Sequence, residues 1–219
     1  MVGGYYNLKY EYLVFDLDGT ISDPKDGIVR SLNFALSAHG FPSQDEYELS
    51  TYIGPPLDST FKAITKSDNT ELISSLITKY RVRYSDVGFS ENVLYDGIPE
   101  ALEQLSTNPG ITLGICTSKR TDFAARILEY FGLSHFFSFV SGGDVGIEKW
   151  QQLQSLCEQG VISQNSLMIG DRYVDLTAAH RNGLRSAGVL WGYGSLTELK
   201  QHDPAHILSS PCELAALAA

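Results

Sequence analysis

The stretch Tyr12-Leu13-Val14-Phe15-Asp16-Leu17-Asp18-Gly19-Thr20 joins a continuous apolar run to two carboxylates and a glycine turn. Continuous apolar runs that end in turn residues are typical of strands buried on both faces, as in a parallel sheet. Asp18 alone would fit an ordinary turn. Asp16 would not, because burying a carboxylate without a partner is expensive. An extended chain directs Asp16 and Asp18 to the same side, so we expect both to approach one point above the sheet.

Further strands and helices alternate along the rest of the chain. Short apolar runs predict strands at 111–116, 137–140, 167–169 and 186–190. Apolar residues three and four positions apart predict helices at 98–105, 123–131, 150–157 and 176–179. This alternation predicts an α/β fold with a doubly wound parallel sheet, whose sites lie at the carboxyl ends of the strands.

One segment breaks this alternation. It has helical patterns at 28–36, 58–65 and 71–84 but no buried strand. Turn residues cluster on both sides of it, near 22–24 and 94–97. We therefore predict a core domain made of residues 1–22 and 96–219, and an inserted helical cap domain made of residues 23–95.

Composition narrows the class of protein. The 219 residues include 26 acidic and 16 basic side chains, which give a formal net charge of −10. This balance argues against a nucleic-acid binder or an anionic-membrane binder. No apolar run approaches the roughly 18 residues of a membrane span, and residues 1–7 lack the features of a signal peptide. The three cysteines are far apart, as expected for free thiols in a cytoplasmic protein. The sequence leaves monomer and homodimer open.

Carboxylates also follow the predicted strand at 167–169. Asp171 and Asp175 lie one helical turn apart, where they would alternatively cap a helix and complement its dipole. Together with Asp16 and Asp18, up to four carboxylates would converge, and such a cluster needs compensating positive charge. A hard divalent cation with few protein ligands suits this role, which favours Mg²⁺.

Two other strand ends carry groups that suit phosphate. Thr117 and Ser118 follow the strand at 111–116, where a hydroxyl and backbone N–H groups either bind phosphate or cap a helix. Lys149 follows a glycine-rich loop and is either a surface lysine or a point charge for a phosphate oxygen.

The order and placement of these residues resemble the haloacid dehalogenase superfamily. The matching segments are Asp16-Leu17-Asp18-Gly19-Thr20, Thr117-Ser118-Lys119, Lys149 and Gly170-Asp171-x-x-x-Asp175. The helical insertion resembles the cap of the phosphoglycolate phosphatase-like branch, and the resemblance covers nearly the whole chain. One departure is Trp150, because this branch commonly has proline after the third-motif lysine. Trp150 could alter the shape of the loop that carries Lys149. Lys119 could then share the binding of phosphate with Lys149.

The resemblance implies a role for each carboxylate. Asp16 would attack phosphorus and form an aspartyl-phosphate, and Asp18 would act as general acid and then general base. Asp16, the backbone carbonyl of Asp18 and Asp171 would hold Mg²⁺. Asp175 would lie behind these ligands and orient them.

The resemblance also implies the phosphate-binding residues, which are Thr117, Ser118, Lys149, Gly19 and Thr20. The expected activity is Mg²⁺-dependent hydrolysis of a small, phosphoglycolate-like phosphomonoester. A 5'-nucleotidase, a pyrophosphatase and a β-phosphoglucomutase-type phosphomutase remain open, as does a phosphate-binding module without turnover. The cap would select the substrate, with Arg30, Arg81 and Arg83 as candidates.

Overall fold

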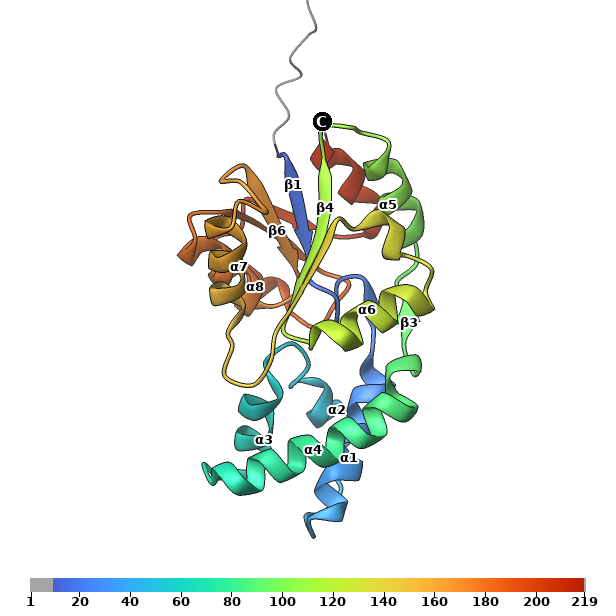
Figure 1. Cartoon of the computed structure of the whole chain (residues 1–219), viewed down its shortest axis with the longest axis vertical. Helices are drawn as coiled ribbons and strands as arrows, with labels where there is room; N and C mark the ends of the chain where they lie inside the picture. Colours follow the sequence, from blue (N-terminus) through green and yellow to red (C-terminus); the bar gives the residue numbers. More distant parts are fainter. Residues whose placement is uncertain (1–9, 219) are drawn as a thin grey trace, which may run out of the picture.

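A computed structural model describes residues 10–218, so the residues 1–7 considered for a signal peptide lie outside the described part. One six-stranded parallel sheet forms the centre of the molecule (Figure 1), in the order β5-β4-β1-β6-β7-β8. The strands are β1 (Tyr12–Phe15), β4 (Thr112–Thr117), β5 (Phe139–Gly142), β6 (Ser166–Gly170), β7 (Arg185–Val189) and β8 (His206–Leu208). The predicted α/β fold with a doubly wound parallel sheet is confirmed.

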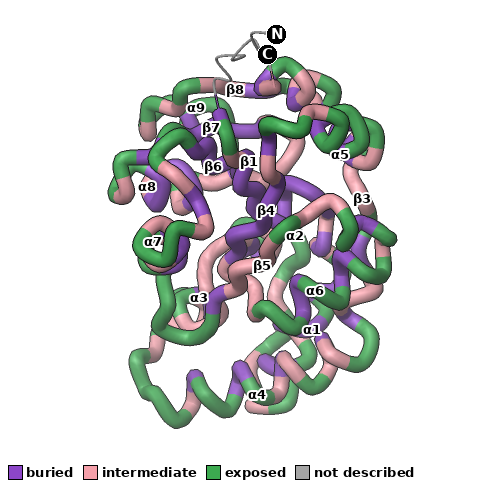
Figure 2. Tube along the Cα trace, turned by 45° about the horizontal axis from the view of Figure 1, so that its top comes forward, coloured by how far each residue is buried: buried purple, intermediate pink, exposed green. Residues whose placement is uncertain are grey.

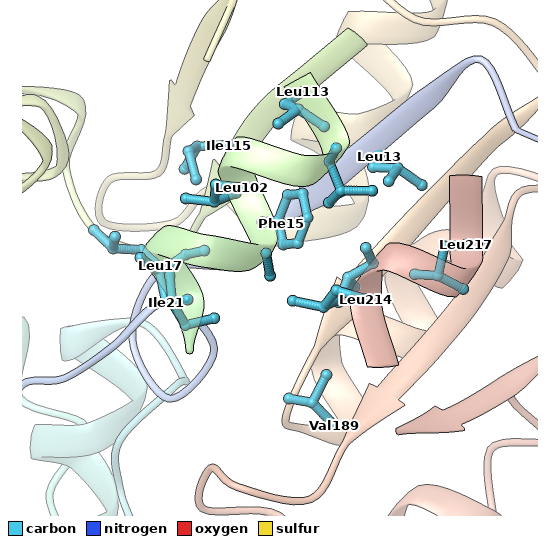
Figure 3. Close-up of a cluster of buried hydrophobic side chains, with 14 of the residues drawn as sticks. Leu13, Phe15, Leu17, Ile21, Leu102, Leu113, Ile115, Val189, Leu214 and Leu217 are labelled. Carbon is cyan, nitrogen blue, oxygen red and sulfur yellow. The ribbon is translucent and has the colours of Figure 1, made fainter. Parts of the chain in front are cut away.

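Helices cover both faces of the sheet. One face packs against α5 (Ile98–Ser106), α6 (Thr121–Tyr130) and the 3-10 helix η3 (Pro211–Ala218), and the other against α7 (Lys149–Glu158) and α8 (Tyr173–Arg181). Leu13 and Phe15 of β1 enter the first cluster, which Figure 3 shows, whereas Val14 enters the second. Burial on both faces explains why this strand is a continuous apolar run.

Helices α1 (Lys25–Ala38), α2 (Glu46–Ser50), α3 (Leu57–Thr65) and α4 (Thr70–Asp86) lie together below the sheet in Figure 1. They share a buried cluster that includes Leu32, Phe61 and Leu76. Buried and exposed residues alternate along α4, whereas β1 is buried almost throughout (Figure 2). The domain boundaries that the sequence suggests stay a prediction.

Two expected elements differ in detail from the structure. The strand predicted at 137–140 lies at Phe139–Gly142, because Ser134–Phe136 form a 3-10 turn (η2) before it. The five-residue helix α2 was not expected, and Asp45 caps its first turn by accepting hydrogen bonds from Tyr47 and Glu48. The closing part of the chain adds α9 (Leu196–Lys200). No helix within residues 10–218 has the length and apolarity needed to cross a membrane.

The two connections between the sheet and the helices α1–α4 pair with each other. β2 (Ser22–Asp23) and β3 (Val93–Leu94) form an antiparallel ribbon, in which Ser22 lies opposite Leu94 and Asp23 opposite Val93. A 3-10 helix, η1 (Gly88–Ser90), leads from α4 into this ribbon.

Glu91, between η1 and β3, joins two of these helices. Its carboxylate accepts hydrogen bonds from Arg83 of α4 at 2.8 and 3.0 Å and from Arg30 of α1 at 2.8 Å. The hydrogen bond from Arg83, followed by that from Arg30, outweighs partial burial and lowers the pKa of Glu91 below its ordinary value of 4.5.

We expect Glu91→Gln to lower the free energy of unfolding at neutral pH by about 1 to 2 kcal/mol, because it removes charged hydrogen bonds. A lowered folded pKa means that the stabilisation is complete above the unfolded pKa and is lost as pH falls through the folded value. Urea unfolding of both proteins should therefore give curves that converge in acid. Glu129→Gln, on the exposed side of α6, is the control. A constant difference at all pH values would contradict the assignment.

Candidate active site

The candidate site lies at the carboxyl ends of three adjacent strands. Phe15 pairs with Ile115 of β4 and Ile169 of β6, so β1, β4 and β6 end within two residues of one another along the sheet. The strands β4 and β6 flank β1 on opposite sides, so the order in which strands are added to the sheet switches from one side to the other at β1. Ligand sites in doubly wound sheets occur at such a switch point. Asp16 directly follows β1, and its backbone N–H donates to the Ile169 carbonyl at 2.8 Å.

Three buried carboxylates gather at this edge. Asp16, Asp171 and Asp175 each offer an oxygen, and these oxygens lie within 4.8 Å of one another. Lys149 Nζ lies 2.9 Å from Asp16 Oδ1 and hydrogen-bonds Asp175 Oδ1. Burial disfavours the charged ammonium, but Asp16 and Asp175 outweigh this effect and raise the pKa of Lys149. The lysine therefore stays protonated at the centre of the cluster.

Asp171 has a different set of partners. Its Oδ2 accepts from the backbone N–H of Tyr193 at 2.8 Å, and its Oδ1 from the Thr20 hydroxyl at 3.4 Å. No ion pair within residues 10–218 involves Asp171. Burial, then the charges of Asp175 and Asp16, raise its pKa well above the ordinary value. Burial also raises the pKa of Asp175 to about 6, although Lys149 opposes it.

This arrangement fits a hard divalent cation. Four carboxylates, counting Asp18, face two ammonium groups, those of Lys119 and Lys149. Asp18 Oδ1 is buried and has no hydrogen-bond partner, so it has lone pairs free to bind a ligand. Carboxylate oxygens are the donors that Mg²⁺ prefers.

Asp18 faces the cap rather than the carboxylate cluster. Its Oδ2 lies 2.9 Å from Lys119 Nζ, which also donates to the Tyr84 hydroxyl of α4 at 2.6 Å. Burial raises the pKa of Asp18, and Lys119 partly offsets the shift. Lys119 was considered as a partner for phosphate, and the structure places it on Asp18.

Gly19 and Thr20 lie against Asp171 and do not line the cavity described below. Gly19 has φ of +83°, and a Cβ there would stand 2.3 Å from Asp171 Oδ2. The glycine therefore lets the first loop approach the Asp171 carboxylate closely.

A cavity lies between these loops and the cap. Asp16, Asp18, Thr117 and Ser118 line its core side. The cap side is largely aromatic and aliphatic, and its residues include Ile28, Leu32, Tyr52, Ile53, Leu57, Tyr80 and Tyr84. Asp16 and Asp18 thus share one cavity with Thr117 and Ser118.

Lys149 keeps its place although Trp150 follows it. It begins α7, and its side chain is buried beneath Asp16. The Trp150 indole hydrogen-bonds Glu148, and its carbonyl accepts from Asn182 at 2.9 Å. The tryptophan therefore packs beside the loop without displacing the lysine.

The three cap arginines proposed for substrate selection separate into two groups. Arg81 lines the cavity and pairs with Asp144 at 2.6 Å. Arg30 and Arg83 are held by Glu91 and do not line it, so the structure removes them as contacts of a ligand there.

Sequence reasoning missed Tyr193. Its N–H holds Asp171, and its hydroxyl hydrogen-bonds Asp23 of β2. Gly192 and Gly194 flank it, and a Cβ at either would come within 2.5 Å of Asp171. The Gly-Tyr-Gly pattern was the available signal, because glycines often mark close approach of the backbone to a site.

Comparison with known proteins agrees with this geometry. Residues 13–189 match the model of the haloacid dehalogenase-like hydrolase family. A 5'-nucleotidase of Pseudomonas aeruginosa is 38% identical over 214 residues, 96% of this chain and 95% of that protein. A phosphoglycolate phosphatase of Pectobacterium atrosepticum is 30% identical over 201 residues, 87% of this chain and 86% of that protein. The solved structure of Mycobacterium tuberculosis protein tyrosine kinase A is 30% identical, with a TM-score of 0.80, over 96% of this chain and 99% of that chain. The chain belongs to the haloacid dehalogenase-like hydrolase family, in its phosphoglycolate phosphatase-like branch, and is an enzyme of the phosphatase type.

Proposed function

We propose that the protein is a Mg²⁺-dependent phosphomonoesterase that works through an aspartyl-phosphate on Asp16. The observation that carries this proposal is the placement of Asp16 and Asp18 in one cavity, with Asp171, Asp175 and Lys149 directly behind Asp16. Asp16, the Asp18 carbonyl and Asp171 would hold the ion, which supplies charge stabilisation for the phosphoryl oxygens when bound.

The chemistry of the two aspartates follows from their positions. An Asp16 oxygen attacks phosphorus while the bond to the ester oxygen breaks, and Asp18 gives that oxygen its proton. Burial raises the pKa of Asp18, which suits a group that must first carry a proton. Asp18 then takes a proton from water, which attacks phosphorus and breaks the bond to Asp16. Inorganic phosphate leaves, and both carboxyl groups return to their starting states.

Ser118 and Lys149 would bind the transferring phosphoryl group, Ser118 from the lining of the cavity and Lys149 from beside Asp16, outside that lining. Lys149 is fixed by two carboxylates and remains charged, so it needs no reorganisation when negative charge develops. Ser118 lines the cavity together with both catalytic aspartates. Thr117 is buried at the end of β4, and its hydroxyl accepts from the Lys119 backbone N–H at 3.3 Å.

The cavity favours an uncharged leaving group. Its cationic side chains are Arg81, Lys119 and Arg120, and they pair with Asp144, Asp18 and Asp122, respectively. A substrate carboxylate, such as that of phosphoglycolate, would have to compete with these carboxylates. The apolar and aromatic side chains of the cap wall, among them Tyr52 and Leu57, instead offer a surface without fixed charge. We therefore propose a nucleoside 5'-monophosphate as the substrate class, in line with the activity named for the Pseudomonas relative.

Asp16→Asn should reduce phosphate release by about four orders of magnitude or more, because the amide is a poor nucleophile. The near-isosteric change should leave the circular dichroism spectrum and cooperative unfolding in place. Asp86→Asn, on the exposed surface of α4, is the matched control and should retain full turnover. Turnover by the Asp16→Asn enzyme would contradict the nucleophile assignment. Transfer of the phosphoryl group to a tyrosine or a sugar, in place of release to water, would contradict hydrolysis.

Removal of metal with EDTA should abolish phosphate release, and Mg²⁺ should restore it. Mg²⁺ should also raise the unfolding temperature, because a ligand that binds only the folded state stabilises it. Asp171→Asn should lose most of this increase, whereas Asp86→Asn should keep it. Full activity in EDTA would exclude the proposed metal requirement.

AMP should be hydrolysed with a kcat/KM at least about tenfold above that of phosphoglycolate, because a buried carboxylate without its own cation costs several kcal/mol. A phosphate-release assay at fixed Mg²⁺ measures both values, and p-nitrophenyl phosphate serves as the reference ester. Preference for phosphoglycolate would show that Arg81 or Arg120 leaves its partner to bind substrate.

A further inference from the structure

Arg172 links the catalytic loop to the wall of the cavity. It lies between the proposed metal ligand Asp171 and Tyr173, where α8 begins. Its guanidinium Nη1 donates to the carbonyl of Ile53 at 2.6 Å and to that of Thr51 at 3.2 Å. Both carbonyls belong to the segment 51–57, which we call the cap loop and which runs from the end of α2 to the first residue of α3.

The cap loop forms a continuous part of the cavity wall. Six of its seven residues, 52–57, line the cavity beside Asp16 and Asp18. Pro55 and Pro56 have no N–H, so these residues cannot donate backbone hydrogen bonds to fix the loop. Gly54 lies directly on Arg172, since a Cβ there would stand 3.1 Å from Arg172 Cγ, and its φ is +116°. The arginine thus supports the loop through its carbonyls and through packing.

Arg172 also makes hydrogen bonds to carboxylates of the core. Its Nε donates to Glu198 Oε1 at 3.0 Å, and the same oxygen accepts from the Tyr173 N–H at 2.9 Å. Its backbone N–H donates to Asp175 Oδ2 at 3.0 Å. The planar fork of an arginine can satisfy a carboxylate and two carbonyls together, which the single ammonium of a lysine cannot match.

Other polar contacts also join the cap to the core, but the two that line the cavity act differently. Arg81 and Tyr84 reach the core from α4 through their side chains, to Asp144 and Lys119. Arg172 instead reaches outward from the catalytic loop and holds main-chain atoms of the cavity wall. The position of this wall is therefore tied directly to the position of Asp171.

We propose that Arg172 is a specificity-determining positioning residue, which holds the cap loop at the distance from the catalytic carboxylates that fits the leaving group of the substrate. This inference rests on the proposed phosphatase function and adds the residue that sets its selectivity. Arg172 does not touch the reacting atoms, so loss of its guanidinium should impair substrates that reach the cap loop and spare those that do not.

The test compares AMP with acetyl phosphate, whose leaving group is much smaller than a nucleoside. Arg172→Ala should raise KM for AMP by about 10- to 100-fold, because displacement of a wall by about 1 Å has effects of this size. It should leave kcat/KM for acetyl phosphate, and the Mg²⁺ concentration for half-maximal rate, within about twofold of the original values. Arg181→Ala, which removes an exposed arginine from the same helix, is the matched control.

Arg172→Lys separates geometry from charge. The lysine keeps a positive charge beside Asp171, so it should restore AMP binding only in part if the fork is what matters. Full restoration, an equal loss with both substrates, or a changed Mg²⁺ requirement would overturn the proposal. If Arg172→Ala does not fold, Glu198→Gln takes its place. It should raise KM for AMP by a smaller factor and leave kcat/KM for acetyl phosphate unchanged. An equal loss with both substrates would overturn the proposal.

Failure of the proposed function gives a different result. If the original enzyme releases phosphate from acetyl phosphate but not from AMP, the substrate class is wrong. The comparison then uses the largest ester found active in a phosphate-release screen, and Arg172→Ala must still affect it more than acetyl phosphate. If neither compound is hydrolysed and Asp16→Asn changes nothing, the phosphatase assignment itself fails.

Discussion

The ion pairs of Lys149 with Asp16 and Asp175 hold the site together. All three side chains are almost completely buried, and the ammonium lies between carboxylates from the end of β1 and the start of α8. Loss of one partner from such a buried set leaves an uncompensated charge, which typically costs about 3 to 5 kcal/mol. The lysine thus fixes Asp16, the proposed nucleophile, and Asp175 in one arrangement, before any ligand arrives.

Charge is distributed unevenly around this cluster. Lys119 pairs with Asp18 and Lys149 with both Asp16 and Asp175, whereas Asp171 accepts hydrogen bonds from neutral donors, Tyr193 and Thr20. Within the described chain, the local excess of negative charge therefore centres on Asp171, where a cation would be most strongly favoured. The cap contributes mostly apolar and aromatic surface, and its one arginine in the cavity is already paired. In the proposed function, the core would therefore bind the phosphoryl end and the cap would select the shape of the leaving group.

Much of this arrangement could be predicted from the sequence. A carboxylate directly after a continuous apolar run is a strong signal, because it conflicts with burial unless the residue has a function. That signal identified Asp16 and Asp171, and the strand order of a doubly wound sheet explains why they meet. The strand at 139–142 was placed two residues early, because the apolar pair Phe136-Phe137 belongs to a turn and its exit.

The contacts between distant segments could not be predicted. Lys119 with Asp18, Tyr193 with Asp23, and Arg172 with Ile53 each join residues at least 100 positions apart, and neither periodicity nor spacing encodes such pairs. The contacts of the cap arginines could not be predicted from their spacing either. Arg81 and Arg83 are two positions apart on one helix, yet one lines the cavity and the other is held by Glu91.

The antiparallel ribbon of β2 and β3 has a mechanical consequence for the enzyme. Two independent linkers would let the cap twist and slide in many directions, but strands joined by backbone hydrogen bonds must bend together. Tyr193 fastens one of these strands, through Asp23, to the peptide that orients Asp171. A movement of the helices α1–α4 relative to the sheet would therefore act on the loop that carries Asp171, the proposed metal ligand. The ribbon would thus couple access to the cavity with the position of the Asp171 carboxylate.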